Sequence, residues 1–211
     1  MTMRLLHLLL LACLAGCDVI EQPQGLIPHW TTAYKEVISE SDRVRLRDWR
    51  KTFVDALDAA RKSGHGAEIA REGSFLDPDA AIPGPAIPNG SYRCRVIKLG
   101  ARDPGNLDFV TYPPFACRVH AQRTLQRLTK LRGSQRYVGL IFPGDAIRKL
   151  FLGTLVLGDE IRALQYRQDE QRDVAGYVER IGPNRWRLLM PQPHFESRLD
   201  VMELVPQGAP R

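Results

Sequence analysis

Cysteine is scarce in this sequence of 211 residues, which contains only four. Four cysteines are too few for a disulfide-rich mini-protein or for a cysteine-rich zinc array. Hydrophobic residues make up 44% of the chain and charged residues 26%, a globular composition that excludes the disordered and collagen-like classes. The length allows one good hydrophobic core with a small appendage.

The common catalytic and nucleotide-binding motifs are also missing. The chain has no G-x-S-x-G nucleophile elbow, no H-E-x-x-H, no Walker A sequence, no G-x-G-x-x-G and no S-x-x-K. Catalytic groups can still assemble from distant positions, but these absences favour a protein that is not an enzyme. The histidines and cysteines lack the spacing of a metal site, and nothing in the sequence indicates a cofactor.

Only one long apolar run is present, from Leu5 to Leu14, and about ten residues are too few to span a bilayer. The run ends in Leu-Ala-Gly-Cys at residues 14–17, as at the cleavage site of a bacterial lipoprotein. We expect residues 1–16 to be a signal peptide and Cys17 to carry acyl chains such as palmitate, which anchor the protein. An ordinary signal peptide followed by a chance cysteine is the alternative.

This anchor predicts a location on the periplasmic side of the cell envelope, on either the inner or the outer membrane. Cys94 and Cys117 would then be the remaining cysteines of the mature chain. In an oxidising compartment they form a candidate disulfide, because both lie on the apolar set of a predicted strand. Two unpaired buried thiols are the alternative.

The mature chain is expected to be α+β, with helices first and strands after them. Residues 17–30 are polar and rich in turn formers, which is typical of a tether. Residues 31–81 predict a helical segment, because apolar residues from 46 to 60 recur at helical spacing. Residues 82–90 predict a Pro/Gly linker. Residues 91–206 contain about eight short alternating runs between turns, which predict a mostly antiparallel β-domain, either a barrel or a sandwich.

The β-domain holds the positive charge: residues 90–205 contain 19 Lys and Arg against 12 Asp and Glu. Arg93, Arg95 and Arg118 fall opposite the apolar sets of their strands, so they would cluster on one face if those strands pair. We interpret them as a candidate site for an anion or a partner. Pairing with local carboxylates, such as Asp103, Asp108 or Asp200, is the alternative.

Three residues remain as candidates for catalysis. His194 and Glu196 are two apart, so in a strand they point the same way, and the carboxylate could orient the imidazole as a general base. Ser134 follows a glycine in a predicted turn, where it could be an exposed nucleophile. A surface histidine and an ordinary turn-forming serine are the alternatives.

Several segments match one family in order: Y-R-C-R-V-I-K-L-G at 92–100, G-S-Q-R-Y-V-G-L-I-F-P at 133–143, F-L-G-T-L-V-L-G-D-E at 151–160, and R-D-V-A-G-Y-V-E-R-I-G-P-N-R-W-R-L at 172–188. From about Trp30 to Pro206 the chain resembles the bacterial family catalogued as domain of unknown function 4893. The resemblance implies an envelope protein of uncharacterised activity and supplies no catalytic residues.

These observations predict a lipid-anchored, non-enzymatic module that binds an anionic ligand or an envelope protein through its basic β-domain. No nucleic acid is expected as a partner, because the export signal removes the usual one. A hydrolase acting on an envelope polymer through His194, Glu196 or Ser134 is one alternative. A periplasmic barrel that resembles a protease inhibitor is the other.

Overall fold

The computed structural model describes residues 25–208 of the chain. Short helices come first: η1 (Tyr34–Glu36), α1 (Glu40–Arg47), α2 (Trp49–Lys62), α3 (Gly66–Glu72) and η2 (Gly73–Phe75). The Ser39 hydroxyl accepts a hydrogen bond from the Asp42 backbone N–H (3.2 Å) and so caps the start of α1. Within this part of the chain, no helix has the length and apolar character needed to span a bilayer. The predicted signal peptide and Cys17 lie outside the described residues.

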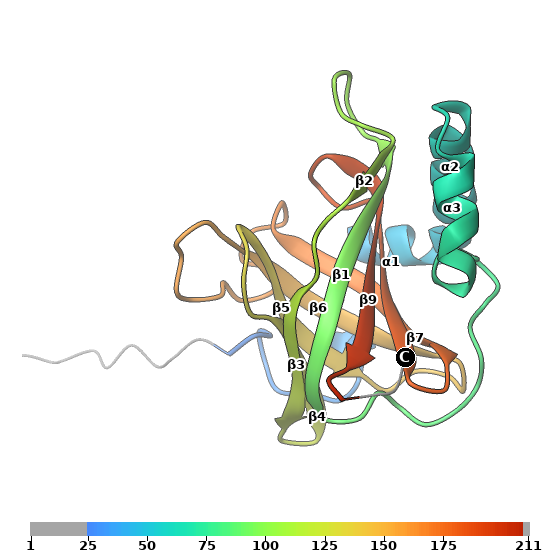
Figure 1. Cartoon of the computed structure of the whole chain (residues 1–211). Coiled ribbons are helices and arrows are strands. Elements are labelled where there is room, and N and C mark those ends of the chain that lie inside the picture. Colours follow the sequence, from blue (N-terminus) through green and yellow to red (C-terminus); the bar gives the residue numbers. More distant parts are fainter. Residues whose placement is uncertain (1–24, 209–211) are drawn as a thin grey trace, which may run out of the picture.

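Nine antiparallel strands follow: β1 (Gly90–Ala101), β2 (Phe109–Thr111), β3 (Phe115–Gln122), β4 (Leu125–Lys130), β5 (Gln135–Phe142), β6 (Arg148–Leu157), β7 (Asp173–Gly182), β8 (Arg185–Pro191) and β9 (Ser197–Pro206). Strands β3 to β9 pair in chain order, β1 pairs with β3, and β9 pairs back with β1. Eight strands therefore close into a barrel, and β2 pairs outside it with the second half of β1 (Figure 1). The predicted α+β class is confirmed, and the closure shows a barrel rather than a sandwich.

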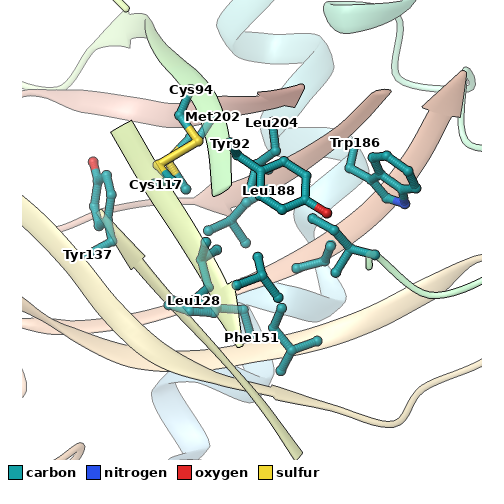
Figure 2. Close-up of a cluster of buried hydrophobic side chains, with 14 of the residues drawn as sticks. Tyr92, Cys94, Cys117, Leu128, Tyr137, Phe151, Trp186, Leu188, Met202 and Leu204 are labelled. Carbon is teal, nitrogen blue, oxygen red and sulfur yellow. A yellow bond between two sulfur atoms is a disulfide. The ribbon is translucent and has the colours of Figure 1, made fainter. Parts of the chain in front are cut away.

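Large apolar side chains fill most of the barrel interior (Figure 2). Alternate residues of each strand point inwards, and they form a buried cluster that includes Tyr92, Cys94, Cys117, Leu128, Tyr137, Phe151, Trp186, Leu188, Met202 and Leu204. Gly139 and Gly153 face each other across β5 and β6. A Cβ atom on these glycines would lie 2.5 Å and 2.9 Å from the Phe151 ring, so both positions must stay free of side chains.

Cys94 of β1 and Cys117 of β3 form a disulfide inside this core, with their Cα atoms 6.0 Å apart. The prediction of a bridge between them is thus confirmed. Cys94 pairs with Phe115 in the last pair of the β1–β3 ladder, beyond which β1 pairs with β2 instead. The bridge therefore joins the two strands close to the point where they separate.

Helices and the N-terminal segment cover much of the outer surface. Helices α2 and α3 pack on β1, β8 and β9, and α1 packs with the preceding segment against β5 to β7. Leu26 and Ile27, which we expected to belong to the tether, are buried in this second layer, so a tether would end before them. The outer side of β3 and β4 carries no helix (Figure 1).

Candidate functional site

The barrel interior becomes polar at one end, which we call the mouth: there β4 ends and β5 and β9 begin. A pocket of about 260 Å³ lies at the mouth. Its apolar lining includes Val96, Tyr112 and Phe115, and its polar lining includes Lys98, Lys130, Ser134, Gln135, Tyr137 and Glu196. A concave site with a few polar groups among apolar ones is typical of pockets for small molecules.

Strand alternation places the two lysines in this pocket. Lys98 follows Tyr92, Cys94 and Val96 on the inward set of β1, at steps of two residues. Lys130 lies opposite Cys117 in the β3–β4 register, so it also points inwards. Both lysines therefore occupy inward positions, and farther from the mouth the equivalent inward positions carry apolar side chains.

Asp200 of β9 forms the centre of a buried polar network beneath the pocket. Its carboxylate accepts hydrogen bonds from Tyr137 Oη (2.7 Å) and from Ser197 Oγ, and it lies 3.7 Å from Lys98 Nζ. Burial raises the pKa of Asp200, and Lys98, Ser197 and Tyr137 oppose that rise. Burial and the adjacent carboxylate also raise the pKa of Tyr137 well above its ordinary value, so this hydroxyl stays a donor.

Lys98 is fully supplied with partners. Its ammonium donates to Glu196 Oε2 (2.6 Å) and to Gln135 Oε1 (3.0 Å), besides its contact with Asp200. Burial works against the charge of Lys98, but Asp200 and Glu196 outweigh it and hold its pKa above the ordinary value. We therefore assign Lys98 to the structure of the mouth rather than to ligand binding.

Lys130 lacks such partners. Its ammonium lies 4.3 Å from the centre of the Phe115 ring and 5.6 Å from that of Tyr137. In residues 25–208 no carboxylate lies within ion-pair distance of it. Burial, with Lys98 and Arg136 nearby, lowers the pKa of Lys130 to about 8. Asp200 opposes this fall only in part, so Lys130 presents to the pocket a partly buried positive charge without an ion-pair partner in the described residues.

A comparison with known families identifies the domain that carries this pocket. A family model described as "Domain of unknown function (DUF4893)" matches residues 34–204. The chain belongs to the DUF4893 family. No curated protein and no solved structure matches it. The matched range includes both lysines of the mouth, and a function for this DUF4893 protein has to be argued from their surroundings.

The three predicted catalytic residues divide between two places in the DUF4893 barrel. Ser134 and Glu196 line the mouth pocket together. His194 lines a narrow adjoining cavity instead, beside Arg45 and Asp173. Burial lowers the pKa of His194, with a further contribution from Arg45, so its imidazole is mainly neutral at pH 7. The histidine and the serine are therefore not brought together in one pocket.

The three predicted arginines also separate. Arg95 donates to Glu203 (2.5 Å) and pairs with Glu72 of α3, so its charge is satisfied by carboxylates distant in the sequence. Arg93 and Arg118 are exposed on the outer side of β1 and β3. With Arg127 of β4 they form a surface that we call the basic face. Among the described residues none of these three side chains has an ion pair.

No sequence motif marks Lys98, Lys130, Tyr137 and Asp200 as a group. A signal was available for Lys98, because a lysine on the apolar set of a strand must either find a partner or reach solvent. The pairing of β1 with β9 brings Asp200 next to Lys98, and the sequence does not reveal that pairing. Within residues 25–208, no group of three or more metal-ligating side chains is placed to hold a metal ion.

Proposed function

We propose that this DUF4893 protein is a lipid-anchored binding module that takes a small organic carboxylate in the barrel mouth. The observation that carries the proposal is the uncompensated ammonium of Lys130 inside a pocket with an apolar wall. By contrast, the buried cations Arg45, Lys98 and Arg187 each have a carboxylate partner. A buried charge that its own fold leaves unpaired is favoured when a ligand supplies the opposite charge.

The surrounding groups support a carboxylate with an apolar body. Gln135 accepts from Lys98 through Oε1, so its amide NH₂ is available to donate to a ligand. The Ser134 hydroxyl on the same lining is a second donor. The Tyr112 and Phe115 side chains offer apolar area to the ligand body. A charge-assisted hydrogen bond from Lys130 would orient the carboxylate.

The anchor and the compartment are part of the proposal. The Leu-Ala-Gly-Cys sequence at 14–17 supports lipidation of Cys17 on the periplasmic side of the envelope. The disulfide between Cys94 and Cys117 supports the same location, because such bridges persist in oxidising compartments. Replacing Cys17 with Ala should release the protein from membranes that are washed at high salt, where electrostatic binding is screened, and retention of that variant after the wash would contradict lipidation.

The ligand proposal is tested with three probes: benzoate, phenylacetate and succinate. The mature chain carrying Cys17→Ala is titrated with each while NMR signals of Phe115 and Tyr137 are recorded, and benzamide serves as a neutral control. We expect a carboxylate to bind and benzamide not to bind. Lys130→Met should weaken binding by about tenfold or more, whereas Lys62→Met on the surface of α2 should not. If no carboxylate shifts these signals, the proposal is wrong.

A hydrolase is the second candidate function, because Ser134 lines the same pocket as Lys130. A lysine with a pKa of about 8 can act as a general base near neutral pH. A fluorophosphonate probe should then label Ser134, and the labelling should disappear in Ser134→Ala and in Lys130→Met. Absence of labelling in the folded protein would remove this candidate.

A further inference from the structure

The basic face combines Arg118 and Arg127 of β3 and β4, whose outer side no helix covers, with Arg93 at the exposed start of β1. Arg118 lies opposite Ser91 and Arg93 opposite Ala116 in the β1–β3 register, and Arg127 lies opposite His120 in the β3–β4 register. All four basic side chains are on the outward set of their strands. From residue 109 to residue 144 the chain has no Asp or Glu that could neutralise them.

These charges are close together and are not compensated within the described residues. His120 lies directly opposite Arg127 across β3 and β4, so a positive charge on His120 would be unfavourable. Burial, Arg127 and Arg118 together lower the pKa of His120, and its Nδ1 is buried without a hydrogen-bond partner. Burial also lowers the pKa of Arg127. Within the described residues the three arginines of this face have no ion pair, and an external anionic surface would supply the counter-charge.

The start of the described chain packs against β5 to β7 and reaches the β3–β4 turn at Trp30. Trp30 stacks under Arg123 at the β3–β4 turn, with the guanidinium carbon 4.7 Å from the ring centre. Gly25 accepts a hydrogen bond from Gln165 in the β6–β7 loop. Cys17 is eight residues before Gly25, a span of at most about 28 Å when fully extended. An acylated Cys17 would thus hold the barrel close to a bilayer.

We propose that the basic face lies against an anionic phospholipid surface. The charge complementarity of Arg93, Arg118 and Arg127 to lipid phosphates carries this proposal, and the anchor described under the proposed function serves only to keep the face near the bilayer. Each basic side chain near such a surface strengthens association by about fivefold, so three arginines contribute on the order of 100-fold. This attraction alone is weak, and its effect on the anchored protein is to set its orientation.

The test uses the mature chain with Cys17→Ala, so that no acyl chain contributes. Binding is measured by sedimentation with vesicles of phosphatidylcholine and with vesicles that also contain phosphatidylglycerol, at low salt. We expect binding to the anionic vesicles only, and loss of binding as salt is raised. The variant Arg93→Ala/Arg118→Ala/Arg127→Ala should lose about 100-fold in partitioning. Unchanged partitioning of this variant would overturn the proposal.

A matched variant controls for net charge. Lys62→Ala/Arg71→Ala/Arg162→Ala removes the same charge from exposed positions outside the basic face, and it should keep most of the binding. If both triple variants lose binding equally, net charge and not this face is responsible, and the proposal is wrong. Binding of soluble polyphosphate without binding of vesicles would overturn it in favour of a polymer partner.

Two further variants separate folding and ligand effects. Arg118→Lys keeps the charge and should retain vesicle binding, and circular dichroism of the triple variant shows whether its barrel is intact. If that variant unfolds, single alanine variants replace it, and each should weaken binding by about fivefold. Lys130→Met should bind vesicles normally. Its failure in the carboxylate titration would therefore affect the proposed function without affecting this inference.

Discussion

Removal of the Cys94–Cys117 bridge should lower the free energy of unfolding by an amount that the loop length sets. The two cysteines are 23 residues apart in the sequence. Closing a loop of this length in the unfolded chain corresponds to about 3.4 kcal/mol at 25 °C in the chain-entropy treatment. Both side chains are buried in the barrel, so Cys94→Ala/Cys117→Ala loses packing as well. We expect the double variant to be destabilised by about 3–5 kcal/mol.

Urea denaturation followed by tryptophan fluorescence measures this loss, because Trp186 packs edge-on against Tyr92 in the same core. The melting temperature should fall by about 6–20 °C for a domain of this size. Reduced wild-type protein, with its thiols confirmed by alkylation and mass spectrometry, separates the loss of the bridge from the loss of packing. If fully reduced protein loses less than about 1 kcal/mol, the loop-closure reasoning is refuted.

Three other changes have expected outcomes. Arg187→Met leaves the fully buried Glu179 with Arg148 as its remaining ion-pair partner. Urea denaturation should show a free energy of unfolding lower by about 3–5 kcal/mol, and adding Glu179→Gln should recover part of it. The affinity for benzoate should fall about tenfold between pH 7 and pH 9 by calorimetry, because the ammonium of Lys130, with a pKa of about 8, deprotonates in that range; a constant affinity would contradict the role of Lys130. Burial raises the pKa of Asp173 to about 7. The stability that this shift supplies is fully present below about pH 4, and as the pH rises to 7 the free energy of unfolding falls by up to about 4 kcal/mol. Asp173→Asn should remove that loss, and equal pH dependence of unfolding in both proteins would refute it.

Local patterns predicted much of the fold. The alternation of apolar residues in β1 and β3 indicated both strands, and it placed Cys94 and Cys117 on their inward sets. That information is local, because side-chain direction has a period of two residues. The choice between a barrel and a sandwich was not local. It depends on the pairing of β1 with β9, whose partners are about 100 residues apart, such as Tyr92 and Pro206.

The candidate site was less predictable for the same reason. Arg95 was expected to find partners among nearby acids or to bind an anion, but its carboxylates are Glu72 of α3 and Glu203 of β9. Glu72 precedes Arg95 in the sequence and Glu203 follows it by more than 100 residues, so the three meet only when the helices pack on the closed barrel. Ser134 was a candidate because of its predicted turn and Glu196 because of its spacing to His194, and the structure places both in the lining of the mouth pocket. The two lysines of the same pocket belong to no motif, because each is a single charge within a strand.

The polar mouth is costly for the fold, and this cost supports a role in binding. Burial of Lys98 and Asp200 removes two charges from water, and apolar side chains of similar volume often stabilise a protein as well or better. Away from the mouth, the interior of the same barrel is filled with apolar side chains. Lys98 offsets the charge of Asp200, and Tyr137 donates a hydrogen bond to the same carboxylate, so these three residues form a preorganised polar floor. Lys130 stands beside this floor without a partner in the described chain, and a ligand carboxylate is the group that would complete the arrangement.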